Sequence, residues 1–140
     1  MTNKRRVTDA DYRRLAEFRY AIRIFLEFSE QAARGAGITP QQHQALLTIR
    51  GLNPGEEAAL GTLAQQLRIK HHSAVELTKR LAVRGLLRRR SDPTDRRRVL
   101  LSLTAKAERI LASLSAAHLD ELKRMHSALL DVVERPDRGL

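Results

Sequence analysis

The 140-residue sequence contains no cysteine, which excludes disulfide bonds, zinc sites with thiolate ligands and cysteine-based redox switches. Aromatic residues are scarce: there is no tryptophan, and the two tyrosines and three phenylalanines all precede residue 29. No stretch approaches the run of about 18 apolar residues that a membrane span requires. The charged N-terminal segment lacks the apolar core of a signal peptide. These absences predict a cytoplasmic protein.

Acidic residues are also in short supply. The chain has 26 Lys and Arg against 16 Asp and Glu, a formal charge of +10. Such an excess favours a polyanionic partner, either nucleic acid or an anionic membrane surface. Residues 68–98 hold eleven basic and three acidic residues, whereas the other 109 residues carry a net charge of only +2. One segment is therefore expected to form the basic surface.

Apolar periodicity predicts a mostly helical N-terminal part. Residues 10–34 carry apolar side chains at helical spacing over more than half of the circumference. A helix that is covered on one side only needs a narrower apolar stripe, so this pattern indicates an oligomer. Thr39, Pro40 and Gln42 form the capping-box pattern that starts a second helix. That helix ends at the loop formed by residues 51–58, which contains Gly, Pro and Asn.

Two short helices joined by a tight turn are predicted next, at residues 60–69 and 71–84. The outer face of the second is polar and basic, as a helix-turn-helix requires. Gly85 ends this helix. Residues 86–90 and 98–103 then alternate as the strands of a hairpin, joined by the turn sequence Ser-Asp-Pro-Thr-Asp. The hairpin has basic flanks and is interpreted as a wing.

Thr104 is expected to cap a last helical segment that runs to about residue 133. A continuous helix of this length would extend about 45 Å. Because that exceeds the size of a small domain, its apolar stripe needs a partner. The pattern leaves open a break near His126 and Ser127.

The expected fold class is mainly α, an α+β winged helix. A winged helix-turn-helix core at residues 60–103 is flanked by dimerisation helices at residues 10–34 and 104–135. We predict a single domain over residues 1–140.

Two segments carry a family resemblance. The sequence DPTDRRRVLLSLT at residues 92–104 has the spacing of a known wing motif, and residues 63–89 match the helix-turn-helix that precedes it. On these segments the chain resembles the multiple-antibiotic-resistance regulator (MarR) family of bacterial transcription factors. The resemblance implies an obligate homodimer on a pseudo-palindromic operator, released by a small effector that is often an aromatic anion. A subgroup senses peroxide through cysteine, and that route is closed here.

The outer face of the helix at residues 71–84 is expected to enter the major groove, where polar and basic side chains bind base edges. The candidate contacts from this helix and its start are Lys70, His72, Ser73, Glu76, Lys79 and Arg80. Ser73 and Glu76 also have the spacing of a capping box, so these two could instead start the helix.

In the wing, the resemblance matches Arg97 to the family's minor-groove arginine and Asp95 to the acid that holds it. A narrow minor groove concentrates negative potential and favours an inserted guanidinium, which a carboxylate can orient beforehand. The alternative is a surface ion pair worth under about 1 kcal/mol. Arg96 and Arg98, whose facing alternates along the chain, are further candidates, and one of them is expected to contact phosphate.

An effector pocket is expected where the first helix meets the second helix and the helix-turn-helix. Tyr12, Arg19, Arg23 and His43 are the candidate ligand contacts, and each could equally be a dimer or core contact. Catalysis is not expected, because no carboxylate pair, nucleophile motif or phosphate-binding glycine loop is present. We also expect no cofactor and no metal site.

The favoured function is a dimeric, sequence-specific DNA-binding regulator, a repressor released by a small molecule. One alternative is a basic adaptor for an anionic membrane surface or an acidic protein, but membrane binding would need amphipathic helices with basic polar faces. Another is single-stranded nucleic-acid binding, which usually relies on aromatic stacking. The basic segment contains no aromatic residue.

Overall fold

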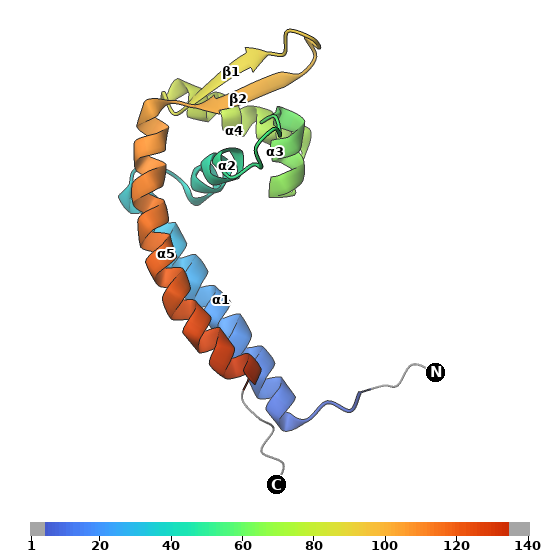
Figure 1. Cartoon of the computed structure of the whole chain (residues 1–140), viewed down its shortest axis with the longest axis vertical. Coiled ribbons are helices and arrows are strands. Elements are labelled where there is room, and N and C mark those ends of the chain that lie inside the picture. Colours follow the sequence, from blue (N-terminus) through green and yellow to red (C-terminus); the bar gives the residue numbers. More distant parts are fainter. Residues whose placement is uncertain (1–4, 135–140) are drawn as a thin grey trace. The chain divides into compact units, whose positions relative to one another are not determined.

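The computed structural model describes residues 5–134 (Figure 1). In chain order these residues form α1 (Asp9–Gly35), α2 (Pro40–Arg50), α3 (Leu60–Leu67), α4 (His71–Val83), β1 (Leu87–Ser91), β2 (Val99–Leu103) and α5 (Ala105–Glu134). The predicted fold class, a mainly helical winged helix with a two-stranded wing, is confirmed. Parts of two predictions lie outside the described residues. They are residue 135 of the second dimerisation segment, and residues 1–4 and 136–140 of the predicted domain.

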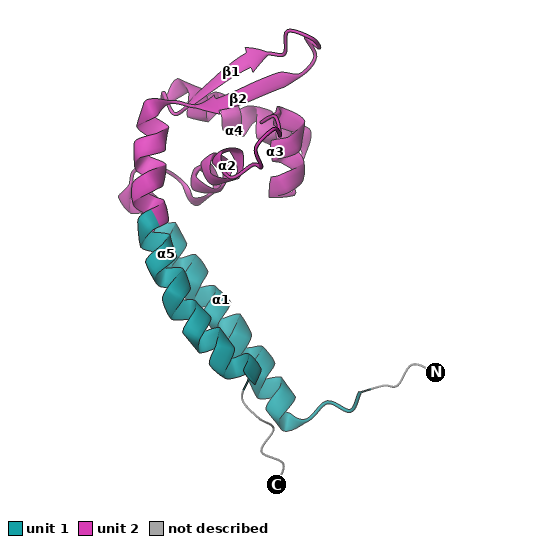
Figure 2. Cartoon of the chain, viewed as in Figure 1, with its two compact units in different colours: residues 1–31, 116–140 teal, residues 32–115 magenta. Residues whose placement is uncertain are grey.

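The described chain divides into two compact units (Figure 2). Unit 1 comprises residues 5–31 and 116–134, and unit 2 comprises residues 32–115. Helices α1 and α5 each contribute residues to both units. The single domain over residues 1–140 and the dimerisation role of the two long helices stay predictions.

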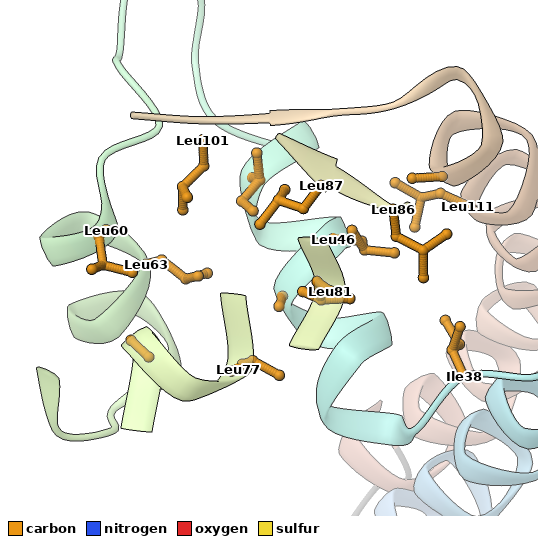
Figure 3. Packing of buried hydrophobic residues seen from close by; sticks show 14 of the residues in the cluster. Ile38, Leu46, Leu60, Leu63, Leu77, Leu81, Leu86, Leu87, Leu101 and Leu111 are labelled. Carbon is orange, nitrogen blue, oxygen red and sulfur yellow. The ribbon is translucent and has the colours of Figure 1, made fainter. Parts of the chain in front are cut away.

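Unit 2 contains the hydrophobic core, in which leucines from separate elements converge (Figure 3). Leu46 of α2, Leu63 of α3, Leu81 of α4 and Leu86 before β1 are each at most 2 % exposed. Thr78 of α4 is also fully buried. Its hydroxyl donates to a carbonyl one turn earlier in the helix, at 3.1 Å, so its polar atom is satisfied inside the core.

The capping box predicted for α2 is formed. The amide of Gln42 donates to the hydroxyl of Thr39, and the amide of Thr39 donates to Oε1 of Gln42, both at 3.0 Å. Pro40 occupies the first turn, where a missing N–H is harmless. These local interactions explain why α2 begins where the sequence predicts.

The turn of the helix-turn-helix is made by Arg68, which adopts a left-handed conformation with φ of 58°. This conformation is uncommon for a residue other than glycine, and it ends α3. Lys70 is the N-cap residue of α4 and makes no side-chain capping bond. Ser73 therefore lies inside the first turn of α4, and the alternative capping box of Ser73 and Glu76 is wrong.

Strands β1 and β2 pair antiparallel, with Leu87 opposite Leu103 and Arg89 opposite Leu101. Gly85, at a φ of 69°, turns the chain from α4 towards β1, which is a conformation that favours glycine. On its other side, β2 receives an isolated bridge from Ala59. Strand β2 thus pairs with β1 on one edge and makes a single bridge on the other, which fixes the wing to the segment that precedes α3.

Helix α5 is unbroken over its 30 residues, so the break left open near His126 and Ser127 is not formed. Thr104 caps the helix as predicted: its hydroxyl accepts from the amide of Ala107 at 3.2 Å and donates to the carbonyl of Gly85 at 2.7 Å. The second bond ties the start of α5 to the end of the helix-turn-helix.

In unit 1, α1 and α5 lie side by side (Figure 2). His118 of α5 lies 2.8 Å from the hydroxyl of Ser29 and meets the rings of Phe25 and Phe28 edge-on. Many large apolar side chains of this unit remain exposed. They are Tyr12, Leu15, Phe18, Tyr20, Ile24, Leu26, Leu119, Leu122, Leu130 and Val133.

Truncation of Leu81 tests the core of unit 2. We expect Leu81→Ala to lower the free energy of unfolding by about 2–5 kcal/mol, because the lost methyl groups leave a cavity in a packed core. The matched control is Val83→Ala in the same helix, where the side chain is 88 % exposed. The control should change the stability by no more than about 0.5 kcal/mol. Urea denaturation of both variants measures the difference, and equal stabilities would contradict this packing.

Candidate nucleic-acid interface

Helix α4 is buried along one side only. Ala74, Leu77, Thr78 and Leu81 enter the core, and Val75 and Ala82 beside them are half-buried. The opposite side, here called the outer face of α4, exposes His71, His72, Glu76, Lys79 and Arg80. Of the other predicted contacts, Lys70 is exposed just before the helix, and Ser73 is half-buried.

The cations of the outer face are available to a ligand. Within residues 5–134, neither Lys79 nor Arg80 forms an ion pair or a side-chain hydrogen bond. The other side of α4 packs in the core, so these unpaired cations can contact phosphates or base edges without rearrangement of the protein.

Asp92 organises the wing turn, which we define as residues 92–98. The residue is only 5 % exposed. One carboxylate oxygen accepts from the amide and the hydroxyl of Thr94, at 2.9 and 2.8 Å, and the other lies 3.4 Å from Nη1 of Arg98. The backbone hydrogen bond from Thr94, then its hydroxyl, and then Arg98 lower the pKa of Asp92, because each favours the charged carboxylate.

Arg98 is held within the protein. Its guanidinium pairs with Glu57, which precedes α3, as well as with Asp92. This ion pair reinforces the backbone bridge between the wing and the segment at residues 57–59. By contrast, the guanidinium groups of Arg96 and Arg97 form no ion pair in the described part of the chain, and both residues are exposed. Of Arg96 and Arg98, Arg96 is thus the one without an ion pair in the described residues.

Asp95 takes a different role from the one that the sequence predicts. Its carboxylate accepts from the backbone amide of Arg97 at 3.1 Å and does not bind the guanidinium. Its carbonyl accepts from the amide of Arg98 at 2.9 Å. Asp95 therefore shapes the turn that presents Arg97. Asp92 and Glu57 were not among the predicted site residues, although an Asp two residues before a Thr is a known turn signal.

The predicted effector residues lie in different units. Tyr12, Arg19 and Arg23 are exposed on α1 in unit 1, whereas His43 of α2 is buried in unit 2. Unit 1 contains a cavity of about 380 Å³ between α1 and α5, lined by apolar groups such as Tyr20, Phe25, Met125 and Val132. None of the four predicted residues lines this cavity.

Residues 5–134 contain neither a metal-ligating cluster nor a membrane-spanning helix. No group of three or more His, Asp or Glu side chains there could hold a metal ion. None of the helices in that range is both long enough and apolar enough to cross a membrane.

Comparison with known sequences connects the chain to one family. A model of the MarR family matches residues 36–98, which reach from directly after α1 to the end of the wing turn. A Thauera aromatica protein assigned as a putative transcriptional regulatory protein for the hcr operon is 29 % identical over 110 residues. That alignment covers 79 % of this chain and 64 % of the relative, so the chain spans less than two thirds of that protein.

Solved structures share the fold. AbsC, a MarR family transcriptional regulator from Streptomyces coelicolor, matches with a TM-score of 0.73 at 19 % identity, over 94 % of this chain and 90 % of its own. A mutant of Staphylococcus aureus MepR bound to an oligodeoxyribonucleotide matches with a TM-score of 0.63 at 20 % identity, over 84 % of each chain. PcaV from Streptomyces coelicolor, in complex with its natural ligand, matches with a TM-score of 0.51 at 27 % identity, over 66 % of this chain and 60 % of its own.

Acidification is expected to loosen the wing turn. Because the folded pKa of Asp92 is lowered, its contribution to stability is present above the ordinary pKa and is lost as the pH falls through the folded value. The Thr94 amide, which donates to Asp92, should therefore be protected from hydrogen exchange near neutral pH and lose protection below about pH 4. Asp92→Ala should abolish the protection near neutral pH as well, after correction for intrinsic rates. Unchanged exchange in this variant would refute the role of Asp92.

Proposed function

The chain belongs to the MarR family of winged-helix transcriptional regulators, and we propose that it is a dimeric repressor of a pseudo-palindromic operator. The observation that carries the proposal is the set of unpaired cations that unit 2 presents on two neighbouring elements. Lys79 and Arg80 lie on the outer face of α4, and Arg96 and Arg97 lie in the wing turn. Double-stranded DNA is the polyanion whose grooves accept a helix and an arginine-bearing turn.

In this proposal, α4 enters the major groove. His72, Ser73 and Glu76 in its first half contact bases or their neighbours, and Lys70, Lys79 and Arg80 contact base edges or phosphates. The wing places Arg97 in the minor groove, while Arg96 meets phosphate. Asp95 and Arg98 act within the protein to fix the wing turn. The function is binding without catalysis, in the cytoplasm.

The dimer is proposed from the exposed apolar surface of unit 1. Side chains such as Tyr20 and Leu119 are 63 % and 59 % exposed, and an accumulation of exposed apolar side chains favours an interaction site. A second copy of the chain offers the same surface, so a two-fold interface can cover both. A two-fold dimer places its helices on half-sites about one DNA turn apart.

We further propose that a small aromatic anion releases the repressor from its operator. The resemblance to PcaV, whose structure holds its natural ligand, supports a ligand-responsive protein. Tyr12, Arg19, Arg23 and His43 remain candidate ligand contacts. An effector that binds the DNA-free state more tightly shifts the population away from the operator.

Arg97→Ala tests the wing contact. We expect operator affinity to fall by about tenfold or more, which corresponds to about 1.4 kcal/mol for a lost minor-groove contact. Arg109→Ala, an exposed arginine of α5, is the control for net charge and should bind nearly as the wild type does. Fluorescence anisotropy with an operator selected from genomic fragments gives both affinities, and sedimentation checks that the dimer stays intact. Equal affinities of the two variants would remove the minor-groove role.

Leu119→Glu tests the dimer interface. A carboxylate in the apolar surface of unit 1 should convert the dimer to monomers at micromolar concentration, because burying an unpaired charge is strongly unfavourable. Leu47→Glu in α2 is the matched control, since Leu47 is 47 % exposed in unit 2. Sedimentation equilibrium distinguishes the two states. A Leu119→Glu protein that remains dimeric would place the interface elsewhere.

A further inference from the structure

Unit 2 contains a cationic cavity between the start of α2 and the end of α4. We call it the α2–α4 cavity. It measures about 340 Å³ and is lined by Gln42, Lys79, Arg80, Val83 and Arg84. Lys79 and Arg80 belong to the outer face of α4, whereas Gln42 and Arg84 were not among the predicted contacts.

The charge of the α2–α4 cavity is uncompensated. Three of its five lining side chains are cations and none is an acid. Within residues 5–134, Lys79, Arg80 and Arg84 form no ion pair. Cations gathered around one cavity repel one another, and an anion placed among them would relieve that repulsion.

Gln42 adds a polar group that is built into the fold. It is 6 % exposed, and its Oε1 accepts from the amide of Thr39 at 3.0 Å and from Nη1 of Arg84 at 3.2 Å. The carboxamide oxygen is therefore occupied twice, while its Nε2 donates no hydrogen bond within the described residues. An amide fixed by its oxygen presents its NH₂ group as a donor.

The hydrogen bond from Gln42 also positions Arg84. It occupies Nη1 of the guanidinium, which carries five donors, and leaves the remaining N–H groups for a ligand. The cavity therefore offers a guanidinium, an ammonium, a second guanidinium and an amide, all of them donors. This set matches an oxyanion with several acceptor atoms, such as a phosphate.

We propose that the α2–α4 cavity binds one backbone phosphate of the operator, with Arg84 and Gln42 as direct contacts. This inference rests on the proposed function. Lys79 and Arg80 line the cavity and also lie on the outer face of α4, so one docking event brings a base edge to that face and a phosphate to the cavity. Val83, at the rim, is 88 % exposed. An open site of this kind favours a phosphate that is held in place by the rest of the DNA over a free anion. A phosphate contact at this cavity sets the register of α4 on the DNA.

Gln42→Glu is the decisive variant. Glutamate at this position preserves the acceptor of the capping box, so α2 keeps its N-terminus. It removes the amide donor, however, and places a carboxylate where the phosphate would bind. Gln41→Glu is the matched control, because the exposed Gln41 is adjacent in sequence and does not line the cavity.

Operator affinity of the two variants is compared by fluorescence anisotropy, with thermal unfolding as the check on folding. We expect Gln42→Glu to lose about tenfold or more in affinity, since the variant loses a hydrogen bond to a charged group and gains a repulsive charge. Gln41→Glu should lose far less, and both variants should unfold at or above the wild-type temperature. Equal losses in the two variants would overturn the phosphate site and leave only diffuse attraction.

A single methylphosphonate substitution, moved along the operator, locates the phosphate. We expect wild-type affinity to fall at one position per half-site, and Arg84→Ala to show no further loss at that position. If the affinity loss caused by Arg84→Ala adds to the loss caused by the methylphosphonate at every position, Arg84 does not contact any of these phosphates. A wild-type protein that binds all DNA sequences equally would instead overturn the proposed function, and this inference with it.

Inorganic phosphate distinguishes a free anion from the DNA backbone. The proposal expects millimolar phosphate to give no Arg84-dependent rise in the unfolding temperature. A rise in the wild type that is absent from Arg84→Ala, together with normal operator binding by Gln42→Glu, would assign the cavity to a small anion and overturn the DNA contact.

Discussion

The one-sided burial of α4 is the constraint on which the rest of unit 2 depends. Leu77 and Leu81 fill the core between α2, α3 and the sheet, and Thr78 can join them only because its hydroxyl is satisfied within the helix. Rotation of α4 about its axis would bury Lys79 or Arg80, at a large desolvation penalty. The apolar packing therefore fixes which polar side chains of α4 face outward, and it does so without any contact from a ligand.

The wing depends on a second balance, between repulsion among its arginines and the acids placed to offset it. An arginine-rich hairpin would repel itself if all its cations were free. Asp92 and Glu57 bind Arg98, and Asp95 binds the backbone of the turn. The pairing of β2 with β1 and its single bridge to Ala59 then fix the hairpin to the core. These three acids do not compete with a polyanion for the free arginines of the wing, because each one already has a partner within the protein.

Local sequence signals predicted the elements well. Thr39 and Gln42 started α2, and Thr104 started α5, because a capping interaction joins residues only three apart and shows directly in the sequence. Pairing across the fold was not predictable in this way. Arg98 and Glu57 are 41 residues apart, and Arg84 and Gln42 are 42 residues apart. Asp95 was therefore matched to the guanidinium of Arg97 by analogy, while its carboxylate binds the backbone.

The unbroken α5 shows a different limit. A polar stretch around His126 is compatible with either a break or a continuous helix, and the local sequence contains neither Pro nor Gly to decide between them. The helix remains continuous although much of its apolar stripe is exposed in unit 1.

Some cations of the chain form ion pairs within the protein and others do not, and this difference determines which of them are available to DNA. Arg50 and Arg98 form ion pairs within the chain. The side chain of Arg84 is hydrogen-bonded to the neutral Gln42, so its charge stays uncompensated. Each copy thus brings a small number of well-placed cations to a half-site. If unit 1 joins two copies, the second half-site is bound at the high effective concentration that linkage creates. Under that condition the exposed apolar surface of unit 1 and the free cations of unit 2 serve one purpose, because dimerisation raises the affinity that a few phosphate contacts could not supply alone.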